Sequence, residues 1–142
     1  MGTPTDAIHL AIIPDGNRRW AREHALQFVW QGHKQAIENF GGLIEWCRQE
    51  PRIHTITIWC FSTENWRRDP REVQERMSLL EQYLVTEGPK FIEQQVRFAH
   101  SGRRDRLPAA IVQHIEALEA ATAGFTGFTV HLAIDHGGKD EI

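Results

Sequence analysis

The hydrophobic pattern of the chain alternates between a strand-like and a helix-like period. Apolar runs rich in β-branched and aromatic residues predict strands at residues 9–14 and 53–61, and shorter runs at residues 96–100 and 128–134 predict two more. Between these runs, apolar residues recur at helical spacing, first in a segment that ends before Pro51. This alternation favours an α/β fold with a mostly parallel β-sheet and flanking helices.

Local signals mark the ends of the two later helices. Asp69-Pro70, followed by Glu72, has the order of an N-cap residue, a proline at the first helical position and the glutamate of a capping box. Pro108 predicts the start of the next helix, and Gly124 stands where a C-terminal cap is expected. Each helix therefore has a defined beginning within the sequence itself.

The length of the chain and its last residues predict one domain that is not complete. A chain of 142 residues is long enough for one hydrophobic core, and it contains no internal repeat or linker. The fourth predicted strand is followed by Gly137-Gly138-Lys139, which is typical of the start of another strand–helix unit. We expect residues 1–142 to form a single domain, truncated after its fourth strand.

Composition and charge exclude several classes of protein. The formal net charge is −3, which argues against general nucleic-acid binding because such binding requires a field of positive charge. Cys47 and Cys60 form neither a metal motif nor a disulfide framework, and they predict a reducing compartment. The apolar stretch at residues 8–13 is too short for a signal peptide or a membrane span. We therefore expect a cytoplasmic protein.

Cationic residues follow all four predicted strands. They are Arg18, Arg19 and Arg22 after the first strand, Arg67 and Arg68 after the second, Arg103, Arg104 and Arg106 after the third, and Lys139 after the fourth. The carboxyl ends of parallel strands meet at one edge of the sheet, where ligands bind, so we expect a polyanion site there. Phosphate is the expected anion because guanidinium forks match its oxygens. A single pair such as Arg103-Arg104 is also compatible with an ordinary polar loop.

One carboxylate among these cations, Asp15, predicts a divalent cation. A carboxylate and a phosphate repel each other, but Mg²⁺ commonly joins one or two carboxylates to substrate phosphates. Asp15-Gly16 alone is equally typical of a plain turn. Neither the P-loop motif nor the dinucleotide-binding glycine motif is present in the sequence.

Two longer strings carry a resemblance to a known enzyme family. Residues 9–21 (HLAIIPDGNRRWA) and 61–68 (FSTENWRR) resemble the first sequence blocks of the cis-prenyltransferases, the undecaprenyl diphosphate synthase family. Residues 122–127 (TAGFTG) and 133–138 (AIDHGG) are similar to a later block. Because the blocks are collinear and span nearly the whole chain, it is identified as the N-terminal portion of such an enzyme.

The resemblance implies a reaction and its participants. Isopentenyl diphosphate would condense with an allylic diphosphate such as farnesyl diphosphate to give a Z-polyprenyl diphosphate, with Mg²⁺ as the cofactor. It also implies a homodimer in the full-length form. The lipid-like product would allow peripheral membrane contact by a cytoplasmic enzyme, and no nucleic acid is expected as a partner.

The resemblance also assigns roles to single residues. Asp15, expected to be the Mg²⁺ ligand, is an expected catalytic residue together with His33 and Asn65. The expected substrate-binding residues are Gly16, Asn17, Arg18, Arg19, Trp20, His33, Ser62, Glu64, Asn65, Trp66 and Arg68.

Two larger features follow from the same resemblance. Residues 62–68, with Glu72, resemble a mobile segment that closes over the reacting centre. The apolar stripe of the helix that follows fits either a hydrocarbon tunnel between sheet and helix or ordinary core. The stripe consists of Val73, Met77, Leu80 and Leu84, with Trp59 on the preceding strand.

The chain departs from the family pattern in three places. Residues 25–31 contain no cation where the family has an arginine, and Arg22 is the available substitute. Asp135-His136 stands in place of Asn-Tyr, and Lys139 in place of arginine. The family's isopentenyl-diphosphate-binding block would lie after residue 142, so the chain carries the allylic-diphosphate and Mg²⁺ half of the site. We expect it to be poorly active alone.

Two alternatives to an enzyme remain open from the sequence. One is a non-catalytic partner or a diphosphate-lipid-binding module. The other is a phosphate-binding regulatory domain with unrelated chemistry.

Overall fold

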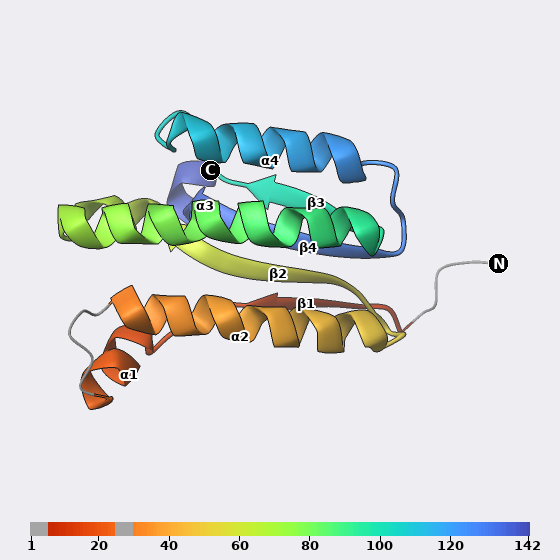
Figure 1. Ribbon diagram of the computed structural model, residues 1–142, viewed down its shortest axis with the longest axis horizontal. Helices are drawn as coiled ribbons and strands as arrows, with labels where there is room; N and C mark the ends of the chain where they lie inside the picture. The colour runs from red at the N-terminus through yellow and green to blue at the C-terminus, as the bar shows by residue number, and fades with distance from the viewer. Residues whose placement is uncertain (1–5, 25–29) are drawn as a thin grey trace.

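The computed structural model describes residues 6–24 and 30–142 and is built on a sheet of four parallel strands (Figure 1). The strands are β1 (Ile8–Ile12), β2 (Ile53–Ser62), β3 (Val96–Ser101) and β4 (Phe128–His136). Their order in the sheet is β1-β2-β4-β3, so β2 and β4 are central. The predicted α/β fold with a parallel sheet and flanking helices is confirmed.

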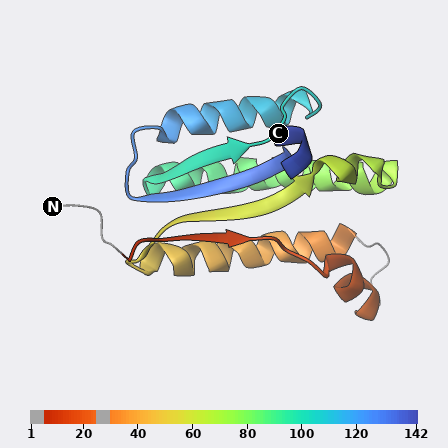
Figure 2. The same cartoon turned by 180° about the vertical axis from the view of Figure 1, so that it is seen from behind.

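Three long helices pack on one face of this sheet. They are α2 (Trp30–Gln49), α3 (Pro70–Glu93) and α4 (Ala109–Thr122). Three short helical segments that the sequence pattern did not predict are α1 (Asn17–Glu23), the 3₁₀ helix η1 (Thr63–Arg67) and α5 (Gly138–Glu141). In Figure 2 the other face of the sheet is turned to the viewer, and none of the three long helices crosses it.

The core lies between the sheet and these helices. On β2, Ile56 and Ile58 are completely buried, and on β4 Val130 pairs in register with Ile56. From the helices, Leu80 of α3 and Ile111 of α4 reach the same cluster. Burial of each such side chain stabilises the folded state by roughly 1.5–3 kcal/mol. Because this gain is large, the apolar period in the sequence indicates which face of each element is buried.

The helix α4 also covers the outer edge of β3. The Thr122 hydroxyl oxygen accepts a hydrogen bond from the Phe98 backbone N–H at 2.9 Å, and the Glu119 carboxylate accepts one from the His100 N–H at 3.4 Å. Unpaired amides on an edge strand are a template for pairing with another chain. Because side chains of α4 accept hydrogen bonds from these two amides, the amides are not free to pair with another strand.

The uncovered face of the sheet carries a row of polar side chains that crosses all four strands. His9 Nε2 lies 2.6 Å from Thr57 Oγ1, which lies 3.1 Å from His131 Nδ1. His131 Nε2 lies 2.6 Å from Ser101 Oγ. The row gives this face hydrogen-bonding groups, so it differs in character from the apolar face under the helices.

Two predicted helix caps differ from the structure. Asp69 caps α3 as expected, accepting a hydrogen bond from the Arg71 N–H at 2.8 Å, but Glu72 does not complete a capping box. Its side chain turns into the functional site described below. Gly124 follows the C-cap residue Ala123 without adopting the left-handed conformation, because α4 ends in right-handed backbone.

No helix of the described residues has the length and apolar character needed to cross a membrane.

Candidate functional site

A polar cleft of about 850 Å³ opens at the carboxyl ends of β1 and β2. Its walls come from the segment between β1 and α1, from α1 itself, from the end of β2 with η1, and from the first turns of α2 and α3. Segments far apart in the sequence meet here because both strands run in the same direction and pair with each other. Parallel sheets place ligands at this end.

Most of the predicted site residues line this cleft. They are Asp15, Gly16, Asn17, Arg18, Arg19, His33, Ser62, Asn65 and Arg68. Three charged residues that were not among the expected substrate-binding residues also line the cleft, namely Arg22, Glu72 and Arg76.

Three predicted residues do not line the cleft. Trp20 stacks on the ring of His24, with centroids 4.2 Å apart. Glu64 is exposed on η1. Trp66 packs edge-on against Phe61 at 4.9 Å, and the Arg106 guanidinium lies 5.7 Å from the Trp66 ring centroid. Their roles in substrate binding remain predictions.

Two glycines allow the β1–α1 segment to take its shape. Gly16 has a φ of +89°, in the left-handed region, and its N–H donates to Asp15 Oδ1 at 2.7 Å. Gly32 lies against α1 so closely that a Cβ atom there would be 2.0 Å from the Asn17 carbonyl oxygen. The contact between α1 and α2 therefore requires glycine, and it places Asn17 beside His33.

The turn from β2 into η1 is held by Asn65. Its side-chain oxygen accepts a hydrogen bond from the Ser62 N–H at 3.0 Å, and the Arg68 N–H donates to the Asn65 carbonyl at 3.1 Å. These bonds fix the end of the predicted mobile segment, residues 62–68, beside the cleft.

The described lining of the cleft carries a surplus of positive charge. Five arginines stand against two carboxylates, which leaves three positive charges in excess. The arginines are Arg18, Arg19, Arg22, Arg68 and Arg76, and the carboxylates are Asp15 and Glu72. The chain as a whole has a net charge of −3, so the surplus is a property of the cleft.

Glu72 is the buried anion of the cleft, with 7% of its surface exposed. Its Oε2 lies 3.8 Å from Arg18 Nη1, and its Oε1 lies 3.5 Å from His33 Nε2. The side chain therefore joins the first turn of α3 to α1 and α2. This explains why Glu72 leaves the capping position that the sequence predicted.

His33 is held in its neutral form. Burial, together with the charges of Arg76 and Arg18, lowers its pKa to about 4, and Glu72 opposes the shift. His33 Nδ1 lies 3.4 Å from the Asn17 side-chain nitrogen. His33 Nε2 is buried and makes no hydrogen bond among the described residues, with Glu72 Oε1 as its neighbour at 3.5 Å.

The arginines that follow β3 lie outside this cleft, which corrects the prediction of one continuous cationic rim. Arg103 pairs with Asp105 and Asp140, and Arg104 pairs with Glu119. The strand order places β4 between β2 and β3, so the ends of β1 and β3 are far apart. Carboxylates of their own region balance these cations.

The Asp135-His136 departure lies in the same separate region. Asp135 is completely buried, and Arg106 donates to both of its carboxylate oxygens, at 3.0 and 2.5 Å. His136 Nε2 lies 2.7 Å from Glu141. A smaller cavity of about 290 Å³ beside Asp135 is lined by both signs of charge and is distinct from the polar cleft.

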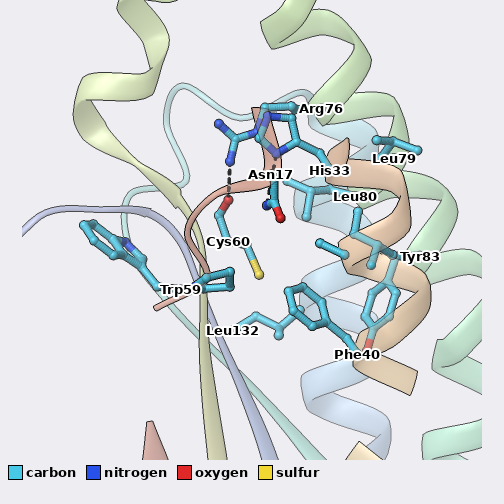
Figure 3. Close-up of a pocket in the computed structure, with 13 residues that line it drawn as sticks. Asn17, His33, Phe40, Trp59, Cys60, Arg76, Leu79, Leu80, Tyr83 and Leu132 are labelled. Atoms are coloured by element: carbon cyan, nitrogen blue, oxygen red, sulfur yellow. Dashed lines mark hydrogen bonds between the residues drawn. The ribbon is translucent and has the colours of Figure 1, made fainter. Parts of the chain in front are cut away.

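A narrow apolar pocket of about 60 Å³ adjoins the cleft between the sheet and the helices. Figure 3 shows Asn17, His33 and Arg76 together at one end of this pocket. Phe40 and Tyr83 lie at the other end. The pocket therefore leads from the polar cleft into hydrocarbon surroundings.

The predicted tunnel stripe contributes little to this pocket. Of its members, Leu80 and Trp59 line the pocket. Met77 and Leu84 are buried in the core, and Val73 packs against the core, so these three do not line it. Ile37, Phe40, Leu79 and Tyr83 supply the remaining apolar wall.

Arg76 was missed by the sequence reasoning. It lies inside α3 rather than directly after a strand, so counting residues after strands could not find it. One signal was available: Glu72, Arg76 and Leu80 are spaced four residues apart, which places two charges on the helical face that bears the apolar stripe.

Asp15 fits a shared Mg²⁺ ion better than a protein-held one. The described residues contain no group of three or more His, Cys, Asp or Glu side chains that could hold a metal. Mg²⁺ is often bound by one or two carboxylates together with substrate phosphates. Asp15 is exposed at the cleft, so it can serve as such a single carboxylate.

The predicted gap in the cationic pattern, residues 25–31, falls largely outside the described residues, which omit 25–29. Its suggested substitute, Arg22, lines the cleft.

Comparisons with known proteins find close relatives. Residues 13–142 match the family model described as "Putative undecaprenyl diphosphate synthase". The isoprenyl transferase of Aquifex aeolicus is 41% identical over 134 residues, and that of Thermus thermophilus is 39% identical over 136 residues. Both alignments cover 94% of this chain, and they cover 57% and 51% of the two relatives, respectively.

A solved structure has the same fold. Lavandulyl diphosphate synthase from Lavandula x intermedia, in complex with dimethylallyl diphosphate, superposes with a TM-score of 0.87 at 30% identity. The match covers 94% of this chain and 57% of that chain. The chain thus spans about half the length of the proteins it matches.

Proposed function

Because the chain belongs to the undecaprenyl diphosphate synthase family of cis-prenyltransferases, we propose that its cleft binds the diphosphate of an allylic substrate in cis-prenyl chain elongation. The substrate pair is an allylic diphosphate and isopentenyl diphosphate. The residues described here form the allylic half of the site. The complex of lavandulyl diphosphate synthase with dimethylallyl diphosphate supports this class of ligand.

The observation that carries the proposal is the surplus of three positive charges in the polar cleft. A diphosphate matches this surplus in sign and in size. Each hydrogen bond from an arginine to a charged oxygen contributes roughly 1.5–3 kcal/mol, so several converging guanidinium groups can bind a diphosphate firmly.

The same residues serve bond breaking. The bond between the allylic carbon and the diphosphate oxygen breaks, and its electron pair remains on the diphosphate. The double bond of isopentenyl diphosphate forms the new carbon–carbon bond to this carbon, and loss of a proton gives the cis double bond. Negative charge grows on the leaving diphosphate, so Arg18, Arg19 and Arg68 stabilise the transition state more than the bound substrate.

The other groups of the cleft position the substrate. Neutral His33 offers its Nε2 to the substrate without adding charge, and Glu72 holds Arg18 in place. A Mg²⁺ ion held by Asp15 and the diphosphate would supply further positive charge to the leaving group. The adjoining apolar pocket receives the start of the hydrocarbon tail.

Two further parts of the proposal rest on the family alone. They are a homodimer in the full-length form and peripheral membrane contact through the lipid-like product. A cytoplasmic location is proposed from the two cysteines and the short apolar stretch of the sequence.

Calorimetric titration tests the proposal directly. We expect dimethylallyl diphosphate to bind in the presence of Mg²⁺, and Arg19→Ala to weaken this binding by about tenfold to a hundredfold, the equivalent of one charged hydrogen bond. Inorganic phosphate is the control for nonspecific anion binding. An absence of diphosphate binding to the wild-type chain would contradict the proposal.

A diphosphate-lipid-binding module is the second candidate, because the surplus of positive charge in the polar cleft would also serve binding without catalysis. A condensation assay with radiolabelled isopentenyl diphosphate tests the two candidates. Product formation by the chain excludes a module that only binds, and binding without product is compatible with both.

A further inference from the structure

We infer that Arg76 is a specificity-determining residue that limits the length of the hydrocarbon tail accepted by the site. This inference rests on the proposed function, because it concerns the tail of the allylic diphosphate bound in the cleft. It goes beyond that function by naming the side chain that separates short from long substrates.

Arg76 stands at the passage between the two cavities. It lines both the polar cleft and the apolar pocket, as do Asn17 and His33 (Figure 3). A diphosphate in the cleft would direct its tail past these three residues. Asn17 and His33 are uncharged at neutral pH, so Arg76 is the cation that the tail must pass.

Two contacts fix the Arg76 guanidinium in this passage. Its Nη2 donates a hydrogen bond to the Cys60 carbonyl oxygen at 2.8 Å, drawn as a dashed line in Figure 3. Its central carbon lies 5.1 Å from the centroid of the Phe61 ring, within the range of a cation–π interaction. Both partners belong to β2, so the side chain bridges from α3 to the sheet.

The space behind Arg76 is small and apolar. The pocket has a volume of about 60 Å³, against about 850 Å³ for the cleft. Its far wall contains Ile37, Phe40 and Tyr83, which offer no charge to balance a guanidinium. A short tail can stop before this wall, whereas a long tail must extend through it.

Admitting a long tail carries a specific cost. The guanidinium must leave the Cys60 carbonyl, which would then be buried beside hydrocarbon without its hydrogen bond. The displaced cation would also lie against apolar carbon, where a charge is unfavourable. An apolar side chain at position 76 would remove both costs and enlarge the passage.

The test compares two allylic diphosphates of different tail length. Calorimetry in the presence of Mg²⁺ would give the dissociation constants of dimethylallyl diphosphate and farnesyl diphosphate for the wild type and Arg76→Leu. We expect the wild type to bind the longer compound no more tightly than the shorter one. In Arg76→Leu the ratio of the two affinities should shift toward farnesyl diphosphate by about tenfold or more.

Arg97→Leu is the matched control, because Arg97 is an exposed residue of β3 remote from the cleft. The control should leave the ratio unchanged. If Arg76→Leu does not fold, as judged by circular dichroism, Arg76→Gln removes the charge with a side chain that can still donate to Cys60, and a shift in the same direction is expected.

The outcomes separate this inference from the proposed function. An unchanged ratio in the Arg76 variants, or an equal loss of affinity for both compounds, overturns the inference and leaves the proposed function standing. Equal loss would mean that Arg76 binds the diphosphate group. Failure of the wild type to bind either compound overturns the proposed function and the inference with it.

Discussion

At the scale of single residues, the cleft combines fixed cations with a neutral imidazole. His33 is surrounded by Arg18, Arg76 and Glu72, and 12% of its side-chain surface is exposed. Burial and the two arginines favour the neutral ring, and only Glu72 favours the charged one. His33 therefore donates or accepts a hydrogen bond at neutral pH without changing the charge of the site.

The lowered pKa of His33 predicts a loss of stability in acid. The folded protein binds a proton at His33 more weakly than the unfolded chain, so stability is complete above pH 6.5 and falls as the pH decreases toward about 4. Between pH 7.5 and 5 this residue should remove about 2 kcal/mol from the free energy of unfolding. Urea unfolding at both pH values measures this difference in the free energy of unfolding.

His33→Gln should lose that part of the pH dependence. Burial also lowers the pKa of His100 and His131, so the remaining acid sensitivity should persist in the variant. His114→Gln, on α4 and away from the cleft, is the control. Identical pH dependence in the wild type and His33→Gln would contradict the neutral assignment.

Asp15 leads to a prediction about Mg²⁺. In the wild type, Mg²⁺ should strengthen the binding of inorganic diphosphate by about tenfold or more. Asp15→Asn should lose this enhancement, because an amide is a weaker ligand, and should keep its unfolding midpoint because Asp15 is exposed. Calorimetry with and without Mg²⁺ measures the effect, with Asp105→Asn as control. Full enhancement in Asp15→Asn would exclude Asp15 as the ligand.

At the scale of elements, the contact between α1 and α2 holds the site together. The pattern of apolar residues predicted α2, α3 and α4 because each is long enough to repeat its period several times. α1, η1 and α5 are too short to show a period, so the sequence pattern could not predict them. Their positions come from close contacts such as the one at Gly32.

Gly32→Ala tests this contact. The new methyl group would meet the Asn17 carbonyl, so α1 must move away from α2. We expect a loss of about 1–3 kcal/mol in the free energy of unfolding and weaker binding of dimethylallyl diphosphate. Denaturant unfolding and calorimetry measure the two effects.

Gly41→Ala in the same helix is the matched control. No atom lies within 4 Å of its Cβ position, so the substitution should stabilise α2 by about 0.5–1 kcal/mol and leave binding unchanged. If Gly32→Ala behaved in the same way as Gly41→Ala, the close contact would have no part in shaping the site.

At the scale of the whole molecule, the strand order divides the carboxyl edge of the sheet into two regions. The sequence could place Asp15–Arg19 and residues 62–68 together, because β1 and β2 are joined by one helix and pair directly. It could not exclude the arginines after β3, because the order β1-β2-β4-β3 is not visible in the hydrophobic pattern. Nor could it show which cations already have carboxylate partners.

This division predicts that arginines after β1 and after β3 have different effects. Arg103→Ala should leave the affinity for dimethylallyl diphosphate within about twofold of wild type, because Arg103 pairs with Asp105 and Asp140 outside the cleft. Arg19→Ala should weaken it by about tenfold or more. Calorimetry of both variants measures the two affinities. Equal losses of affinity for dimethylallyl diphosphate would indicate one continuous site.

The cover that α4 provides for β3 has a consequence for self-association. Side chains of α4 already occupy the outward amides of Phe98 and His100, so this border of the sheet cannot recruit a new strand there. Among the described strands, the border at β1 is the one left for main-chain pairing between copies. Pairing there would join two copies edge to edge and could not continue into a fibre, which needs both borders of every subunit.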